Sequence, residues 1–393
     1  MRSTIGPTVM LWCLAAALAC GAEDQPWLTS RRPLKPMEPE LVWRVGWPSL
    51  LGPCRTWAAL PSGLRLVDDV NQARHLWRSE EPIPSSKEQN AGWIGKVMQS
   101  QDRAPIAGGG GSPILVDGRV YFCYYEPSGT AMDEVERYGG MRFSGGSWKW
   151  PYRQRVHFQK VGATAVGLIE AADVVFCCDA LSGRTLWKRR FVGKGNNYQT
   201  RKDAAVNQRT MCAADGRVYA LGTSCRLYCL DAASGELMWE SATADHQRYR
   251  QDKLHSLATR RRTEYLNPGH GFGYESLLAI DGRIIVKIHG GGLQAFDAAT
   301  GRLAWTQPEA GVFQTCPVPV VWSHQGQTFF LGARWGTVTC TGARTGEIAW
   351  RKEGLHGGLN QVIALGGILV AATTLPGGDE KDELDLNQAS LLR

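Results

Sequence analysis

The sequence predicts an all-β fold, a β-propeller built from four-stranded antiparallel blades, on three observations. One eleven-residue phrase that ends in Trp occurs four times, at residues 177–187, 229–239, 295–305 and 340–350. An Asp-Gly pair between apolar runs precedes three of these phrases. Hydrophobic residues make up 43% and charged residues 21% of the 393 residues, as in an ordinary globular protein. Self-similarity at a period of tens of residues indicates a repeat architecture.

Each phrase predicts a strand, a tight turn and a second strand that carries the tryptophan. Asp and Ser favour turns through local backbone hydrogen bonds, and Gly accepts a positive φ. The Asp-Gly pairs that begin at Asp117, Asp215 and Asp281 predict a second hairpin in each unit. Asp231 follows Asp215 by 16 residues, and the next unit repeats this spacing. Each unit therefore holds about four short strands, which is one propeller blade.

The two ends of the repeat region are incomplete. Residues 67–77 form a weaker copy in which Trp77 is kept and Ala73 replaces the glycine. Residues 362–371 read as a hairpin that no tryptophan strand follows. Two interpretations are open: the Trp77 strand completes the last blade, or the chain is truncated and the ring is incomplete. Five to six blades are expected.

The extent of the repeat region divides the chain into a leader, a lead-in, a propeller and a tail. Residues 1–22 read as a signal peptide with an apolar core at residues 9–19, which is too short to span a bilayer. Cys20 follows a small-residue cleavage signal, so export as a lipoprotein anchored at Cys20 and simple export are both open. An extended lead-in (23–65), the propeller (66–375) and a mobile polar tail (376–393) are expected to follow.

Two long insertions interrupt the propeller, at about residues 126–171 and 242–274. Long loops on a rigid scaffold commonly carry function. The second insertion is basic, which suits either an acidic partner or a solvated charged loop. The net charge of the chain, +7, is modest and spread out, so nucleic-acid binding is not expected. The glycine run at 108–111 precedes a strand and not a helix, so it does not form a phosphate cradle.

The pattern Ala-x-Asp-x-x-x-Gly-x-x-x-Trp resembles the repeat of PQQ-binding-like β-propellers over about residues 66–371. That group includes quinoprotein alcohol dehydrogenases, BamB-type outer-membrane assembly lipoproteins and large secreted proteins of the planctomycete type. In it, the indole of one blade lies against a turn peptide of the next. The resemblance assigns this blade-docking role to Gly183, Trp187, Gly235, Trp239, Gly301, Trp305, Gly346 and Trp350. Because enzymes and non-enzymes share the motif, it indicates the fold and not quinone binding.

Four sets of residues are candidate carriers of chemistry. Cys177 and Cys178 resemble the adjacent cysteines beside the quinone of the dehydrogenases, but neighbouring residues on a strand point to opposite faces. The repeated Asp179, Asp231 and Asp297 suit turn caps better than a cofactor site. His270, His289 and His356 each precede a glycine and could line one mouth, but turn or hydrogen-bonding roles suit them better than metal ligation. Carboxylates that occur only once, such as Glu170, Glu264 and Glu275, are not placed together by any pattern.

The function expected from these observations is that of an exported, non-catalytic binding or scaffold module at the cell envelope or in the periplasm. Its partner would be a protein or a small-molecule ligand at a propeller mouth, and the chain would be a monomer. No catalytic residue and no metal ligand is assigned. Two alternatives stay open: a PQQ-dependent alcohol or sugar dehydrogenase with PQQ and calcium as cofactors, and a BamB-like outer-membrane assembly factor.

Overall fold

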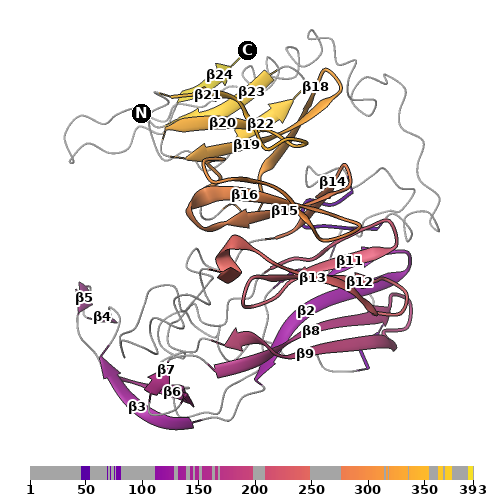
Figure 1. Ribbon diagram of the computed structural model, residues 1–393, viewed down its shortest axis with the longest axis vertical. Helices are drawn as coiled ribbons and strands as arrows, with labels where there is room; N and C mark the ends of the chain where they lie inside the picture. Colours follow the sequence, from indigo (N-terminus) through magenta and orange to yellow (C-terminus); the bar gives the residue numbers. More distant parts are fainter. Residues whose placement is uncertain are drawn as a thin grey trace. The chain divides into compact units, whose positions relative to one another are not determined.

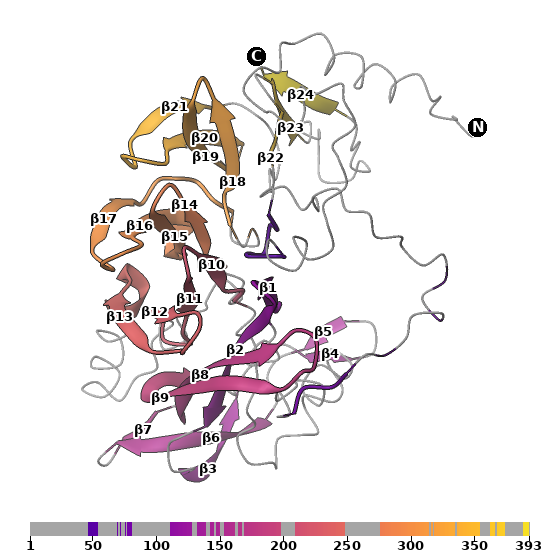
Figure 2. The same cartoon turned by 90° about the vertical axis from the view of Figure 1, so that its right-hand side faces the viewer.

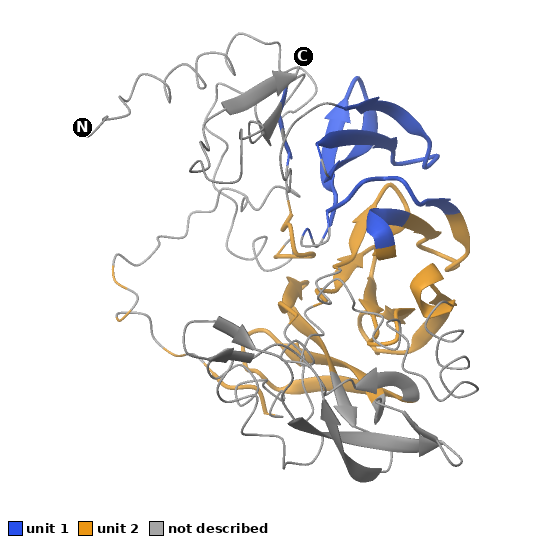
Figure 3. Ribbon diagram, turned by 90° about the vertical axis from the view of Figure 1, so that its left-hand side faces the viewer, with its two compact units in different colours: residues 1–36, 290–293, 305–393 blue, residues 37–289, 294–304 orange. Residues whose placement is uncertain are grey.

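The fold was analysed in a computed structural model. It describes residues 46–53, 69, 71, 75, 77–80, 111–127, 132–138, 142–144, 147–149, 153–161, 164–166, 169–197, 209–247, 276–313, 316, 318–334, 336–353, 362–365, 368–373 and 388–392. The chain divides into two compact units, one of residues 1–36, 290–293 and 305–393 and one of residues 37–289 and 294–304 (Figure 3). In these described ranges no helix has the length and apolarity that crossing a membrane requires.

Four antiparallel sheets of four strands confirm the predicted all-β blades (Figure 1). Blade 1 consists of β1 (Ile114–Val116), β2 (Arg119–Pro127), β8 (Ile169–Asp179) and β9 (Thr185–Asn197). Blade 2 consists of β10 (Cys212–Ala214), β11 (Arg217–Leu221), β12 (Arg226–Asp231) and β13 (Leu237–Ala242). Blade 3 consists of β14 (Leu278–Ile280), β15 (Arg283–Ile288), β16 (Gly292–Asp297) and β17 (Leu303–Gln307). Blade 4 consists of β18 (Val320–His324), β19 (Gln327–Arg334), β20 (Thr337–Gly342) and β21 (Ile348–Lys352). Figure 2 shows β10 to β13 side by side in that order.

The first hairpin of each blade closes through a two-residue turn with positive φ at both positions. In blade 1 these are Asp117 (φ 49°) and Gly118 (φ 69°), and blades 2 and 3 repeat the Asp-Gly turn. Such turns match the right-handed twist of the strands, which is why Asp-Gly predicts them. Blade 4 uses Gln325 (φ 49°) and Gly326 (φ 69°) instead. The sequence reading missed this turn because glutamine is not one of the residues that favour a positive φ.

The repeat phrase forms the last two strands of a blade. In blade 2 its first residue, Cys229, pairs across the sheet with Trp239, and a β-bulge follows directly after Cys229. Blades 1 and 4 repeat both features. A bulge increases the local twist of the strand. The first residue of the phrase is small and buried in every blade: Cys177, Cys229, Ala295 and Cys340 each have an exposed fraction of 0%.

Apolar clusters between neighbouring sheets make up the core. One cluster joins blades 1 and 2 around Tyr121, Cys177 and Tyr228, and another joins blades 2 and 3 around Tyr219, Cys229 and Phe296. A cluster around Trp322 and Val338 packs blade 4. Propeller stability on this plan comes from burying both faces of each small sheet against its neighbours.

The remaining strands belong to the first insertion and to the C-terminal region. Between β2 and β8 lie β3 (Met132–Tyr138), β4 (Arg142–Ser144), β5 (Ser147–Lys149), β6 (Arg153–Val161) and β7 (Thr164–Val166), which form one three-stranded sheet and one hairpin. A further sheet contains β22 (Val362–Leu365), β23 (Ile368–Thr373) and β24 (Gln388–Leu392). β24 falls within the range that was expected to be a mobile tail, and antiparallel pairing with β23 accounts for it.

Candidate functional site

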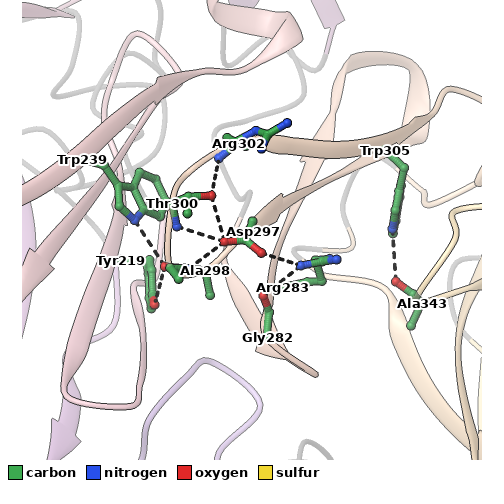
Figure 4. A network of polar contacts seen from close by, with 11 residues as sticks. Tyr219, Trp239, Gly282, Arg283, Asp297, Ala298, Thr300, Arg302, Trp305 and Ala343 are labelled. Carbon is green, nitrogen blue, oxygen red and sulfur yellow. Dashed lines mark hydrogen bonds and ion pairs between the residues drawn. The ribbon is translucent and has the colours of Figure 1, made fainter.

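Tryptophan docking recurs within each compact unit. The indole N–H of Trp187 donates to the Ala232 carbonyl at 3.1 Å. Trp239 donates to the Ala298 carbonyl at 3.2 Å in the same way, and Figure 4 shows this second contact. Two further pairs have the same geometry: Trp77 to Ala180 at 2.8 Å, and Trp305 to Ala343 at 3.2 Å. Each acceptor follows the Asp, or in blade 4 Gly342, of the phrase in the receiving blade. These four indoles therefore each contact the turn between the last two strands of one of blades 1 to 4.

The glycine of each phrase provides the surface on which the indole lies. A Cβ atom added to Gly235 would lie 2.5 Å from the Trp187 ring, and the φ of Gly235 is +68°. Gly183 faces Trp77, Gly301 faces Trp239 and Gly346 faces Trp305 with the same crowding. Trp350 packs against Trp322 of its own blade, with ring centroids 6.3 Å apart. Seven of the eight motif residues thus take part in indole–turn contacts in the described structure, whereas the blade-docking role of Trp350 stays a prediction.

The repeated aspartates hold the turns between the last two strands. Asp231 Oδ1 accepts hydrogen bonds from Ala233 N at 3.0 Å, Ser234 N at 2.7 Å and Ser234 Oγ at 2.9 Å. These bonds stabilise the charged carboxylate, and they lower the pKa of Asp231 from its usual value. The pKa values of Asp179 and Asp297 are lowered by the same kind of bonds, from Ser182 and Thr300 respectively.

The strand order places both insertions at one end of the blades. β2 ends where the first insertion begins, and β8 returns from it, so this is the end opposite the Asp-Gly hairpin. β13 ends at the same end of blade 2, where the second insertion begins. We call this side of the unit the insertion face; its described parts are the start of β8, the turn at 222–225, residues 243–247 and His289.

A buried carboxylate joins blades 1 and 2 just under the insertion face. Asp173, on β8, accepts hydrogen bonds from Thr223 N at 2.8 Å, Thr223 Oγ1 at 2.7 Å and the Tyr228 hydroxyl at 3.0 Å. The side chain is completely buried. Burial raises the pKa of Asp173, while the hydrogen bonds and the nearby Arg209 act against this rise. Gly222 is required here, because an added Cβ would lie 2.1 Å from Asp173 Oδ2.

A second polar cluster joins the base of the second insertion to blade 2. His246 is buried, and its Nδ1 lies 2.8 Å from the Ser224 carbonyl oxygen. Its Nε2 lies 3.1 Å from Arg226 Nη2, and Arg226 also forms an ion pair with Glu240 at 3.0 Å. Thr243 Oγ1 donates to the Cys225 carbonyl at 2.7 Å. Residues 244–247 form one helical turn over this cluster.

The same helical turn also contacts blade 3. Ala244 N donates to Gln294 Oε1 at 2.8 Å, and the Asp245 carboxylate accepts from His289 N at 2.9 Å. His289 therefore contributes its backbone N–H to this contact. Most of the buried polar residues that the structure describes lie in these two clusters or next to them: Asp173, Arg209, Thr210, Thr223, Ser224, Thr243, Asp245, His246, Ser276, Lys287 and Gln294.

The described residues do not fit a quinone site of the dehydrogenase type. Cys177 packs in the cluster between blades 1 and 2, and Cys178 packs in a different cluster with Val174 and Phe176, so the two thiols lie on opposite faces of β8. Burial raises the pKa of Cys177 to about 12, which makes it a poor nucleophile. Within the described ranges, no three His, Cys, Asp or Glu side chains gather as metal ligands.

The other sequence-derived candidates are not brought together. Glu170 lies on β8. His270, His356, Glu264 and Glu275 lie outside the described residues, as do Cys20 and the rest of the predicted signal peptide at residues 1–22. The sequence did not single out the buried Asp173, Thr223 and His246 as a site, because their partners lie in other turns or in another blade. The one available signal was the position of Asp173 and His246, each of which lies beside the boundary of a predicted insertion.

Comparison with known proteins agrees with the fold. The family profile described as "Outer membrane protein assembly factor BamB" matches residues 171–353. Among curated proteins no sequence matches the chain. The structure resembles BamB from Moraxella catarrhalis, with 14% identity, a TM-score of 0.29, and coverage of 62% of this chain and 85% of that one.

Quinohemoprotein alcohol dehydrogenases are also structurally similar. The ADHIIG enzyme from Pseudomonas putida HK5 has 16% identity and a TM-score of 0.32, with 68% of this chain and 39% of that chain covered. The enzyme from Comamonas testosteroni has 15% identity and a TM-score of 0.31, with 55% and 40% covered. The chain thus spans about two fifths of the length of these enzymes. Together with the blade geometry, the profile match shows PQQ-like, BamB-type β-propeller repeats within residues 171–353.

Proposed function

We propose that the chain is a non-catalytic binding or scaffold module at the cell envelope, and that its insertion face binds the partner. The observation that supports this most is the position of the two insertions, which leave the blades on one side. Hydrogen-bonded buried residues hold both insertion bases, since Asp173 lies just after the first and His246 at the start of the second. The recurring positions of the repeat phrase make hydrogen bonds within turns or between blades, as Asp231 and Trp239 do, and this structural role supports a non-catalytic module.

Site-specific photo-crosslinking in the native cells tests this proposal. A photoreactive amino acid at the exposed Gln247, on the insertion face, is expected to give a discrete crosslinked protein. The same amino acid at the exposed Ala299, in the opposite turns, serves as the matched control and should give none. Adducts from Ala299 alone, or from neither position in the folded protein, would contradict the proposal.

The match of residues 171–353 to the BamB profile favours one particular partner class, an outer-membrane protein assembly complex. In that case the Gln247 adduct would be a component of such a complex. Replacement of Cys20 by Ser would move the protein from the membrane fraction to the soluble fraction if a lipid anchor holds it there.

The dehydrogenase alternative requires an independent test. Titration of the purified chain with PQQ and calcium, followed by a dye-linked alcohol dehydrogenase assay, is expected to show neither saturable binding nor alcohol-dependent dye reduction. The physical reason is the separation of Cys177 from Cys178 on opposite faces of β8. Tight binding together with turnover would replace the binding-module proposal by an enzyme.

A further inference from the structure

We propose that His246 is an acid-sensitive latch, which holds the base of the second insertion against blade 2 while its imidazole is neutral and releases it when the imidazole is protonated. The latch consists of His246, its described ring partners Ser224 and Arg226, and the helical turn at residues 244–247. It goes beyond the proposed binding function, and it holds whether or not the insertion face has a partner.

The two contacts of the ring fix its protonation state. A carbonyl oxygen only accepts hydrogen bonds, so the 2.8 Å contact with Ser224 requires a proton on Nδ1. A guanidinium only donates, so the 3.1 Å contact with Arg226 Nη2 requires a lone pair on Nε2. Both hydrogen bonds form together only in the neutral Nδ1–H tautomer. A second proton on Nε2 would point at the Arg226 cation.

Charged groups on the neighbouring elements shape this response. Arg226 lies on β12, Glu240 on β13, Asp245 in the turn itself, and the buried Lys287 on β15. Glu240 ion-pairs with Arg226 at 3.0 Å and orients the guanidinium that meets the ring. His246 is only 4% exposed, so water can compensate little for two adjacent cations. Protonation of the ring should therefore break its hydrogen bond with Arg226.

Other hydrogen bonds that hold this turn should not respond to acid. Thr243 Oγ1 stays bonded to the Cys225 carbonyl, and Ala244 N stays bonded to the Gln294 side chain, since neither contact involves a titrating group. Acid should therefore loosen residues 244–247 and the start of the insertion locally and leave the blades intact. A local opening of this kind is measured as a loss of amide protection.

Hydrogen–deuterium exchange on the full chain tests the latch between about pH 7.5 and pH 5.5, the range in which histidine changes charge. Protection factors for residues 243–247, corrected for intrinsic exchange, are expected to fall about tenfold on acidification. A tenfold change corresponds to a difference of about one unit between the pKa of His246 in the closed turn and its pKa in the open turn. His246→Gln can keep one donor and one acceptor but does not titrate, and it should remove this step. Arg226→Gln should move the step to higher pH by about one unit, or abolish it, because a nearby like charge disfavours protonation.

The controls separate the latch from other histidines and from misfolding. His75→Gln changes an exposed histidine, and His255→Gln changes one inside the second insertion, so both should keep the acid step. Far-UV circular dichroism and the protection of β11 and β12 report whether each variant is folded. Isotope-labelled histidine NMR should show the Nδ1–H tautomer for the resonance lost in His246→Gln. Unchanged protection of residues 243–247 in acid, persistence of the step in folded His246→Gln, or an Nε2–H tautomer would each overturn the proposal.

Discussion

At the scale of single residues, the aspartates of this chain fall into two classes with opposite pH behaviour. The half-buried Asp231 has a lowered pKa because Ser234 and Ala233 donate to it. Its contribution to stability is present above the unfolded pKa of about 3.9 and is lost as the pH falls through the lower folded value. The buried Asp173 has a raised pKa, so its contribution is present in acid and is lost as the pH rises through the folded value.

The substitution Asp231→Asn tests the first class. The Asn side chain keeps an acceptor oxygen for Ser234 and loses the charge, so we expect a loss of less than about 1 kcal/mol at neutral pH. The free energy of unfolding, measured by urea denaturation, should then depend less on pH below about 4 than in the unchanged protein. Glu236→Gln, which neutralises an exposed carboxylate in the same turn, is the matched control. A pH profile identical to that of the unchanged protein would show that the turn bonds do not favour the ionised form.

At the scale of elements, the contact between an indole and the following turn is the unit that joins blade to blade. A comparison of Gly235 with Gly216 allows the contribution of this contact to the free energy of unfolding to be measured, because the φ values of the two glycines are alike, +68° and +71°. An added Cβ at Gly216 meets nothing within 4 Å, whereas at Gly235 it meets the Trp187 ring. The two glycines therefore differ in packing and hardly at all in backbone conformation.

We expect Gly216→Ala to lower the free energy of unfolding by about 1–2 kcal/mol, because a positive φ is strained for a residue with a Cβ. Gly235→Ala should cost about 1–3 kcal/mol more, because the added methyl group displaces the indole from its seat. Urea denaturation of both variants gives the difference. Combination of Gly235→Ala with Trp187→Ala should then be less than additive, since the two changes remove one contact. Equal losses in the two glycine variants would mean that the indole is not seated on Gly235.

The elements also show how far the sequence determines the structure. Local signals were sufficient for the hairpins: Asp-Gly pairs and the Gly-x-x-x-Trp spacing predicted the turns and strands of blades 1 to 3. They failed at Gln325, where the strands impose a positive φ on a residue that does not favour it. They also could not find Asp173 with Thr223, or His246 with Arg226, because these partners lie 50 and 20 residues apart and meet only after the sheets pack.

At the scale of the whole molecule, the repeats form a frame, and both insertions leave blades 1 and 2 at the same end. The register of blade 1 shows where the first insertion can be removed, because β2 and β8 pair up to Pro127 and Ala171. Asp173, two residues further on, still contacts Thr223 in the next blade. The frame and the insertion are therefore separable in principle.

Replacement of residues 128–170 by Asn-Gly should close β2 and β8 into a short hairpin of the kind that this dipeptide favours. We expect the shortened chain to fold, because loop length affects stability weakly, at about 0.6 kcal/mol for each doubling. Its urea midpoint should stay close to that of the full chain. If the insertion face binds the partner, the Gln247 photo-crosslink should weaken in the shortened chain, whereas Ala299→Arg, on the opposite side, should leave it unchanged. A shortened chain that folds and crosslinks at full yield would confine the binding surface to the second insertion, and one that fails to fold would show that the first insertion belongs to the core of blade 1.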